Sequence, residues 1–246
     1  MSIFKRIYES FAFKSNLLKA SNFLYFTKTN PKALELKTND KCLLLAPHPD
    51  DETFGCGGLL IKYPDNFHIV CLTNGIHGNF DENPNHNELK ENRESEFKSA
   101  LEIAGVKSYE FLEIEDRKLI KNHAKFQNIN LKDYDSIFIP YFMDNHKDHK
   151  AVKVLLQKSL RESSYKKDCK IVFYEIWATL PQFNYFTDIT AIRKTKEQMI
   201  NCYPSQLKNL DFLEGIMGLN KYRGTCVNLG YAEAFSIIDI GTFMKL

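Results

Sequence analysis

Residues 42–52 read CLLLAPHPDDE, an apolar run that changes abruptly into a cluster of polar and charged side chains. The run Cys42–Ala46 is short and apolar, which is typical of a buried strand. His48, Asp50, Asp51 and Glu52 follow directly, where the strand ends and a helical pattern begins. Crowded carboxylates repel one another, so a cation or a helix N-terminus has to compensate for their charge. The stretch therefore predicts a strand-to-helix turn that binds a metal ion.

Short apolar runs alternate with longer helical patterns in the rest of the chain. The predicted strands are residues 42–46, 68–73, 109–112, 136–141 and 170–175, with a last apolar segment, 232–238, as an edge strand. Helical patterns cover residues 53–62, 87–104 and 149–162. This alternation is typical of βαβ units and of a mostly parallel, buried sheet. The sequence therefore predicts an α/β fold with one main domain at residues 41–246.

The composition excludes several classes of protein. With 33 Lys and Arg against 31 Asp and Glu, the formal charge is +2, so no strong basic character indicates a nucleic-acid partner. Hydrophobic residues make up 43% of the chain, yet no apolar run approaches the roughly 18 residues needed to cross a bilayer. The six cysteines are dispersed, and the N-terminus lacks a secretory signal. We therefore expect a soluble, cytoplasmic protein with reduced thiols.

Residues 1–40 are a separate, basic segment. Residues 1–41 carry eight basic and three acidic side chains, whereas the remainder carries 25 basic and 28 acidic ones. Apolar residues such as Ile3, Phe4, Ile7 and Phe11 recur at spacings compatible with an amphipathic helix. We favour a helix packed on the main domain, because the pattern is short and strong caps are missing. The alternative is peripheral contact with a membrane surface or a glycolipid.

A second polar cluster, His146-Lys147-Asp148-His149, follows the predicted strand at residues 136–141. In open parallel sheets, ligands bind beyond the carboxyl ends of the strands, at the point where the strand order reverses. Both polar clusters leave the same edge of such a sheet, although they are far apart in sequence. They can therefore meet in one site.

His48, Asp51 and His149 are the predicted metal ligands. Residues 48 and 51 lie three apart, so in a helical turn they face the same side, and residue 149 comes from the opposite loop. Two imidazoles and one carboxylate leave an open position, which is the ligand count of a catalytic zinc site. Iron(II) accepts the same ligands, so Fe2+ is the alternative to Zn2+.

Asp50, His146 and Asp148 are the predicted catalytic residues. Asp50 lies between the ligands and is free to accept a proton from water at the metal, while His146 supplies an unligated imidazole that Asp148 orients. These groups suit hydrolysis of an amide, in which an oxyanion is stabilised and an amine is protonated. Alternatively, residues 50–52 cap the following helix. Capping explains one or two carboxylates, but it explains neither His48 nor the second cluster.

Together these segments resemble the PIG-L/LmbE-like de-N-acetylases, metal-dependent hydrolases that remove acetyl groups from N-acetylated sugars. LLAPHPDDE at residues 44–52 resembles the strand and (A/P)HPDDE signature of that family, and HKDH at 146–149 resembles its H-x-D-H segment. Other similar segments are LTNG at 72–75, the pattern of Arg93, Glu96, Ala100 and Gly105, DIT at 188–190, YPSQ at 203–206 and YAEAF at 231–235. The resemblance runs from about residue 42 to residue 238 and leaves out the first forty residues.

The resemblance implies a Rossmann-like fold, usually with zinc, in which the three predicted ligands bind the metal and Asp50 is the general base. His146 would steady the tetrahedral intermediate or protonate the departing amine, with Asp148 behind it. Lys147 replaces the proline that is most frequent at its position in the family. We expect this replacement to alter the rigidity of the loop without loss of activity.

Arg93 is the predicted substrate-binding residue, because the matching arginine of the family contacts a substrate phosphate or hydroxyl. The alternative is an ordinary ion pair with Glu94 or Glu96 on the helix surface. We favour the substrate contact.

The resulting prediction is hydrolysis of an N-acetylamino sugar, or of its conjugate with a lipid, a nucleotide or a small aglycone, to acetate and a free amine. One alternative is a phosphoesterase, whose sites commonly hold two metal ions. The other is a non-catalytic sugar-binding protein that keeps the metal site.

Overall fold

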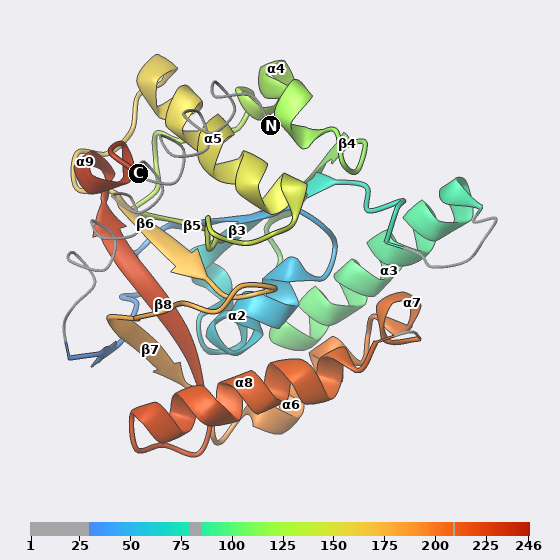
Figure 1. Cartoon of the computed structure of the whole chain (residues 1–246), viewed down its shortest axis with the longest axis vertical. Coiled ribbons are helices and arrows are strands. Elements are labelled where there is room, and N and C mark those ends of the chain that lie inside the picture. Colours follow the sequence, from blue (N-terminus) through green and yellow to red (C-terminus); the bar gives the residue numbers. More distant parts are fainter. Residues whose placement is uncertain (1–29, 79–84, 209) are drawn as a thin grey trace, which may run out of the picture.

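The computed structural model of the chain describes residues 30–78, 85–208 and 210–246. Within these ranges the chain forms a single sheet with helices on both faces (Figure 1). The strands are β1 (Lys32–Ala33), β2 (Cys42–Ala46), β3 (Phe67–Thr73), β4 (Tyr109–Ile114), β5 (Ser136–Pro140), β6 (Lys170–Tyr174), β7 (Tyr185–Asp188) and β8 (Ala232–Asp239). The helices are α2 (Asp51–Lys62), α3 (His86–Ala104), α4 (His123–Phe126), α5 (Lys147–Glu162), α6 (Arg193–Ile200), α7 (Pro204–Leu207), α8 (Phe212–Cys226) and α9 (Ile240–Phe243), with 3-10 turns at Pro64–Asn66 and Leu119–Lys121.

The sheet is mostly parallel, as predicted, and its order reverses beside β2. The strand order is β1-β7-β8-β6-β5-β2-β3-β4. β2 pairs in parallel with β3 on one side and with β5 on the other, and β4 and β6 extend the parallel part outwards. β8 is antiparallel to both β6 and β7. The carboxyl ends of β2 and β5 therefore flank the point at which sheets of this kind bind ligands.

β8 is an interior strand, so the prediction of an edge strand at residues 232–238 is wrong. It lies between β6 and β7, and most of its residues are buried. The strands beyond it escape prediction because β7 reads YFTD and β1 has only two residues. Segments this short lack the alternation of apolar and polar residues that identifies a strand.

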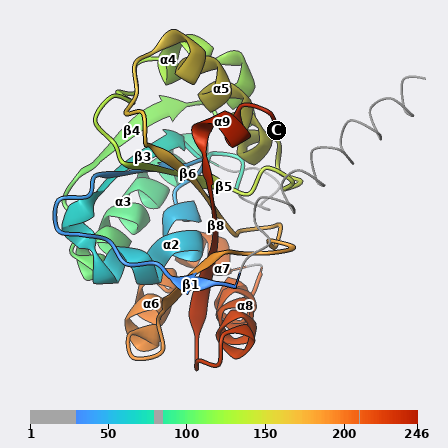
Figure 2. The same ribbon diagram turned by 90° about the vertical axis from the view of Figure 1, so that its left-hand side faces the viewer.

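Two apolar cores hold the sheet between its helix layers. On one face, α5 and α9 pack on strand residues such as Leu43 and Ile137. On the other face, α2, α3, α6 and α8 cover strand residues such as Leu44 and Ile69 (Figures 1 and 2). Successive strand residues point to opposite faces, and a sheet buried on both faces gives continuous apolar runs. The central strands were predictable for that reason.

A buried ion pair fixes helix α2 against the sheet. Lys196 Nζ lies 2.7 Å from Glu233 Oε1 and donates to the carbonyl of Phe54 at 3.0 Å. Glu233 accepts the backbone N–H groups of Gly58 and Leu59 at 2.6 and 2.9 Å. Both charged side chains are buried. The opposite charge and the hydrogen bonds to backbone groups offset the cost of removing each of them from water. The pair therefore holds the helix whose first turn carries Asp51 and Glu52.

Lys32 and Ala33 join the sheet as β1, whereas the amphipathic helix expected before them lies outside the described residues. β1 pairs with β7, and Leu34 is buried in one of the two cores. For residues 1–29 the choice between a packed helix and a membrane-surface element stays a prediction. In the described ranges, no helix combines the length and the apolar character that a membrane span requires.

Gly58 provides a test of how closely α2 approaches the sheet. A Cβ atom at Gly58 would overlap Cγ2 of Ile189, whereas at Gly57 the nearest atom is Cγ of Lys196 at 3.4 Å. We expect Gly58→Ala to lower the free energy of unfolding by about 1–3 kcal/mol, because overpacking displaces the neighbouring atoms. The matched control, Gly57→Ala, should be neutral or stabilise by up to about 1 kcal/mol, since alanine favours helices. Urea denaturation measures both, and equal stabilities would contradict the close packing.

Candidate active site

Two loops at the carboxyl ends of β2 and β5 carry the polar side chains that the sequence places in a site. The first loop joins β2 to α2, and the second joins β5 to α5. The backbone of Asp50, at the start of α2, has φ 144° and ψ −30°, a region that L-residues rarely occupy. Strain of this kind costs about 1–3 kcal/mol and persists only where the surrounding structure imposes it. The turn therefore fixes the directions of the carboxylates of Asp50 and Asp51.

The turn after β3 contacts the first loop and the chain after β4. Thr73 donates to the carbonyl of Pro47 from its backbone N–H at 2.9 Å and from its hydroxyl at 2.8 Å. Asn74 Oδ1 accepts the backbone N–H of Asp116 at 3.1 Å. The LTNG segment thus holds the first loop in place and brings a carboxylate from the chain after β4 into the site.

Three side-chain atoms converge where the sequence predicts a metal site. His48 Nδ1 lies 3.2 Å from Asp51 Oδ2, and His149 Nε2 lies 3.2 Å from the same oxygen. The two nitrogens are 3.3 Å apart, and all three residues are buried. A tetrahedral zinc ion with bonds of about 2.0–2.1 Å keeps its donor atoms about 3.3–3.4 Å apart, so this donor triangle has the dimensions of one face of such a site.

Carboxylates support both imidazoles from behind, and two of them, Asp116 and Asp144, lie outside the sequence motifs. His149 Nδ1 lies 3.0 Å from Asp144 Oδ2. His48 Nε2 lies 3.4 Å from Asp116 Oδ1 and 3.4 Å from Asp148 Oδ2. A metal-binding histidine commonly donates its second ring N–H to a carboxylate, which fixes its tautomer and its orientation. The contacts leave His48 Nδ1 and His149 Nε2 as the nitrogens that face the donor triangle.

Two other groups in the described residues also have donor atoms close enough to hold a cation: His48 with Asp116 and Asp148, and His48 with His146 and His149. In the first group backbone N–H groups occupy three of the four carboxylate oxygens, and Asp116 Oδ1 has no hydrogen-bond partner among the described residues. Asp148 accepts the N–H groups of Arg117 and Leu119 at 2.6 and 3.3 Å, and Asp116 accepts that of His77 at 3.1 Å. Their geometry suits support of His48 better than direct binding of an ion.

His146 stands beside the donor triangle, but Asp148 does not orient it. The ring centroid of His146 lies 4.6 Å from that of His48 and 4.9 Å from that of His149. Its Nδ1 is buried and has no hydrogen-bond partner among the described residues. His146 precedes α5 in an extended conformation and Asp148 lies in the first turn, and residues two apart on a helix do not face each other. The predicted role of Asp148 is therefore corrected, because its carboxylate supports His48.

Asp50 forms a buried ion pair with Arg93 of α3. Arg93 Nη2 lies 2.8 Å from Asp50 Oδ2 and donates to the carbonyl of Pro49 at 2.7 Å. Its Nη1 donates to the carbonyl of Gly75 at 2.8 Å. The side chain is only 2% exposed, so the alternative of an ion pair with a neighbouring glutamate on the helix surface is wrong. Arg93 does line the pocket described below, but its terminal nitrogens bind the protein.

Capping accounts for only one of the carboxylates at residues 50–52, because Glu52 Oε2 accepts the backbone N–H of Asp50 at 3.2 Å. The N-cap residue Asp50 makes no side-chain cap hydrogen bond. Asp51 Oδ2 accepts the N–H of His48 at 2.8 Å, and Glu52 accepts the hydroxyl groups of Thr53 and Tyr203. The three carboxylates still lie at a helix N-terminus, where the dipole favours negative charge.

Burial and neighbouring charges shift the pKa values of these groups in opposite directions. Burial raises the pKa of Asp50 to about 7, although the Arg93 guanidinium opposes the rise. Burial acts in the same direction on Asp51, but the adjacent imidazoles hold its pKa well below the usual value. Burial alone would lower the pKa of His149, yet Asp51 and Asp144 raise it to about 9. The carboxylates therefore favour positive charge in the donor triangle, which is the charge that a bound cation supplies.

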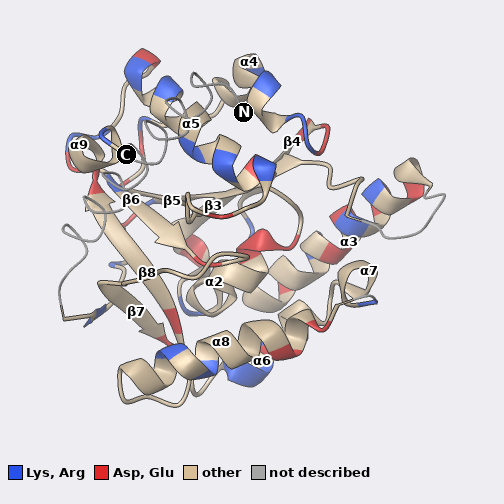
Figure 3. Ribbon diagram, viewed as in Figure 1, with Lys and Arg blue, Asp and Glu red and all other residues tan. Residues whose placement is uncertain are grey.

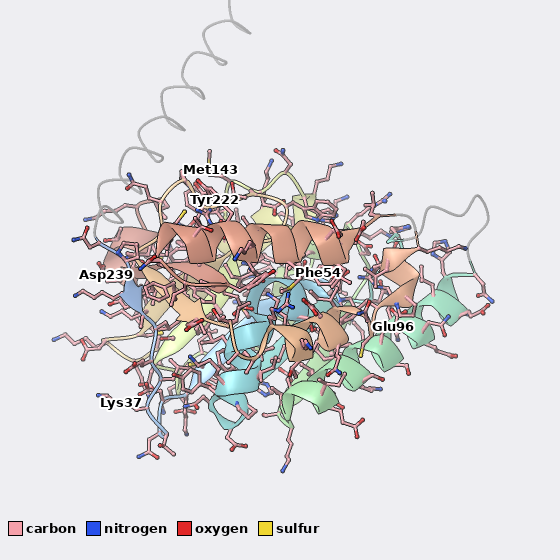
Figure 4. The ribbon with its side chains drawn as sticks, turned by 90° about the horizontal axis from the view of Figure 1, so that it is seen from below. Lys37, Phe54, Glu96, Met143, Tyr222 and Asp239 are labelled. Atoms are coloured by element: carbon pink, nitrogen blue, oxygen red, sulfur yellow. The ribbon has the colours of Figure 1, made fainter. Side chains whose placement is uncertain are left out.

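A pocket of about 270 Å³ opens beside the donor triangle. His48, Asp50, Asp51 and His146 belong to its polar wall. Its apolar wall consists of Phe54, Ile176, Trp177, Leu210 and Phe212. Figure 4 shows Phe54 between α2 and α8. The pocket thus combines a charged end with an apolar side.

Comparison with known proteins confirms the resemblance found in the sequence. The family model described as PIG-L, GlcNAc-PI de-N-acetylase, matches residues 43–159. The matched range contains the donor triangle, Asp50, Arg93 and His146.

Solved structures share the fold. N,N'-diacetylchitobiose deacetylase from Pyrococcus horikoshii has a TM-score of 0.66 and 25% identity, over 81% of this chain and 84% of that chain. The conserved protein TT1542 from Thermus thermophilus has a TM-score of 0.63 and 24% identity, over 80% of this chain and 93% of that chain. The 4-carboxy-2-hydroxymuconate hydratase from Pseudomonas putida has a TM-score of 0.64 and 20% identity, over 81% of this chain and 96% of that chain. The last two show likeness of fold alone.

A double-mutant cycle tests the Asp50–Arg93 pair. Arg93→Met leaves a buried carboxylate without its counter-charge, so we expect the free energy of unfolding to fall by about 3 kcal/mol. Asp50→Asn in the same chain removes that charge and should recover part of the loss, with a coupling free energy of about 2 kcal/mol. Urea denaturation of the four proteins gives the coupling, and strictly additive effects would show that the two side chains do not interact.

Proposed function

We propose that the chain is a metal-dependent deacetylase that hydrolyses the acetyl amide of an N-acetylamino sugar or its conjugate. The products are acetate and a free amine. The observation that carries the proposal is the convergence of His48, Asp51 and His149 beside a pocket lined by Asp50 and His146. The family description and the 25% identity to a diacetylchitobiose deacetylase support acetylated sugars as the substrate class.

Zn2+ is the proposed cofactor, with Fe2+ as the alternative, and the donor triangle fits either ion. Two nitrogens and one carboxylate oxygen are ligands that both ions accept, and they leave the open position of a catalytic site. When bound, the ion polarises the acetyl carbonyl and makes water more acidic. The buried aspartates around the triangle are Asp50, Asp51, Asp116, Asp144 and Asp148, so the site favours a divalent cation.

Asp50 is the proposed general base. Arg93 binds its Oδ2, which leaves the second carboxylate oxygen available to a water molecule in the pocket. Burial raises the pKa of Asp50, and a raised pKa favours acceptance of a proton from water and its later return. The water oxygen adds to the acetyl carbon as Asp50 takes the proton. The C–N bond then breaks, and the amine nitrogen receives a proton from Asp50.

His146 is proposed to stabilise the oxyanion. Burial, together with the neighbouring imidazoles of His48 and His149, lowers the pKa of His146. A neutral imidazole offers one N–H donor, which suits a hydrogen bond to the oxygen of the tetrahedral intermediate. For this reason we assign protonation of the amine to Asp50 and the hydrogen bond to His146.

Arg93 and Asp148 are proposed to position other residues. Arg93 orients Asp50 and neutralises one buried charge, which replaces the substrate contact expected from the resemblance. Asp148 supports His48 from the side opposite the donor triangle. Neither role requires contact with the substrate.

Acetate release is the deciding measurement, because a hydratase has the same fold. The purified chain with one equivalent of Zn2+ should release acetate from N-acetylglucosamine, its small glycosides or N,N'-diacetylchitobiose, and a chelator should stop the reaction. Asp50→Asn should lower kcat about 10²–10⁴-fold while the metal content stays near one ion per chain. His149→Ala should lose the ion.

His68→Ala is the control, because His68 contacts Ser108 and not the donor triangle. Its activity and metal content should equal those of the unchanged chain. Full loading with zinc and no acetate from any acetylated sugar would refute the proposal. Two ions per chain with phosphatase activity would favour the phosphoesterase alternative.

Asp144→Asn tests the support of His149. The amide oxygen can still accept a hydrogen bond from His149 Nδ1, but it lacks the negative charge that strengthens the ligand. We expect the affinity for Zn2+ to fall about 10–100-fold, as measured by competition with a chelating dye. Asp168→Asn, at an exposed position, should leave the affinity unchanged. Equal affinities in the two variants would argue against His149 as a ligand.

A further inference from the structure

We propose that the site takes N-acetylamino sugars whose aglycone is an uncharged apolar chain, and that this chain lies in a groove along α8. The inference rests on the deacetylase function proposed above. The groove has a volume of about 380 Å³. The residues that define it are Ile176, Trp177, Leu210, Phe212, Ile216 and Leu219.

The groove continues the pocket beside the donor triangle. Ile176, Trp177, Leu210 and Phe212 line both hollows. The ring of Phe212 stacks on Phe54 of α2 at 5.1 Å between centroids, and Trp177 meets Phe212 edge to face at 5.2 Å. This row of aromatic rings leads outwards from the helix that carries Asp51. A sugar held at the donor triangle would therefore direct its aglycone into the groove.

The chemistry of the groove selects an uncharged ligand. Trp177 is 55% exposed and Leu210 is 41% exposed, and exposed apolar patches on a protein surface commonly mark binding sites. The described residues that line the groove include no Lys, Arg or His. Helix α8 carries no charged residue between Glu214 and Lys221 (Figure 3). Asp211 does line the groove, but its carboxylate accepts the N–H of Glu214 as a helix cap. The groove thus lacks the cation that a phosphate or carboxylate would need.

Gly215 keeps the floor of the groove free of a side chain. It lies inside α8 without a positive φ, and a Cβ atom there would meet no atom of the described residues within 4 Å. Glycine weakens a helix relative to alanine, yet neither the backbone nor the packing requires glycine at this position. Gly218 is equally open but is not among the lining residues. The two glycines therefore form a matched pair for substitution.

The opposite wall of the groove is held rigidly. Trp177 donates its backbone N–H to Asp144 Oδ2 at 3.2 Å. Leu180 donates its N–H to Glu175 Oε1 at 2.5 Å, and Arg223 of α8 binds both Glu175, at 3.0 Å, and the carbonyl of Leu180, at 2.7 Å. A wall fixed before binding loses little conformational freedom when a ligand arrives. The groove is thus a preformed site.

Alkyl glycosides of N-acetylglucosamine test the proposal through acetate release. Each buried methylene strengthens binding about fourfold, so kcat/KM for the octyl glycoside should exceed that for the methyl glycoside at least about tenfold. Gly215→Leu fills the groove and should bring this ratio close to one. Gly218→Leu, the matched control, should keep the ratio of the unchanged chain.

Fluorescence measures occupation of the groove without turnover, because Trp177 is the single tryptophan of the chain. The octyl glycoside, kept below the concentration at which it forms micelles, should shift the emission to shorter wavelengths in the unchanged chain and in Gly218→Leu. Gly215→Leu should show no such shift, and neither should the methyl glycoside with any of the three proteins.

The two readouts separate the outcomes. Acetate release without preference for the octyl glycoside would overturn the groove and leave the proposed function intact. An emission shift without acetate from any glycoside would overturn the proposed function and this inference with it. Emission that follows the protein concentration, and not the glycoside, would assign the groove to a second copy of the chain and also overturn the inference.

Discussion

Buried negative charge at the carboxyl ends of β2 and β5 is the constraint on which the rest of the site depends. Four buried aspartates lie there, Asp50, Asp51, Asp144 and Asp148, and the buried Asp116 reaches the site from the chain after β4. Carboxylates in a protein interior are costly unless positive charge and hydrogen bonds compensate. Arg93 compensates Asp50, backbone N–H groups bind Asp116 and Asp148, and the imidazoles of the donor triangle face the others. The arrangement favours positive charge between the two loops, and for that reason the same residues suit a divalent cation.

The packing of α2 determines where the carboxylates of its first turn lie. The helix begins at Asp51, and Lys196 and Glu233 hold its middle by contacts with backbone groups. Gly58 allows this middle section to approach Ile189 without a side chain in between. A site that binds a metal needs its donor atoms placed to within about 0.5 Å. The distance between Asp51 and the loop after β5 therefore depends on packing well away from the donor triangle. A core residue that stabilises the fold thus also affects the geometry of the site.

The sequence allowed the central part of the fold and the donor triangle to be predicted, but not what supports them. Cys42–Ala46 was recognisable because a strand buried on both faces is a continuous apolar run. His48 and His149 could be brought together because the carboxyl ends of parallel strands share one edge. Asp116 and Asp144 carry no motif, and their contacts exist only once the turn after β3 and the loop after β5 are folded. Asp148 was assigned to the wrong histidine because closeness in sequence does not give side-chain direction at the start of a helix.

The proposed chemistry and the proposed selectivity belong to different stretches of this chain. The family match covers residues 43–159, which include the donor triangle, whereas the groove is built from residues 176–219. Since a deacetylase and a hydratase both have this fold, the sheet and its loops do not by themselves select a substrate. Binding energy from a remote part of a substrate can serve to position its reacting bond. Here the two stretches meet at Asp144, whose Oδ2 contacts both His149 Nδ1 at 3.0 Å and the N–H of Trp177 at 3.2 Å. A displacement of the Trp177 backbone would move a carboxylate oxygen that also contacts His149, so the proposed selectivity and the proposed metal geometry would be coupled.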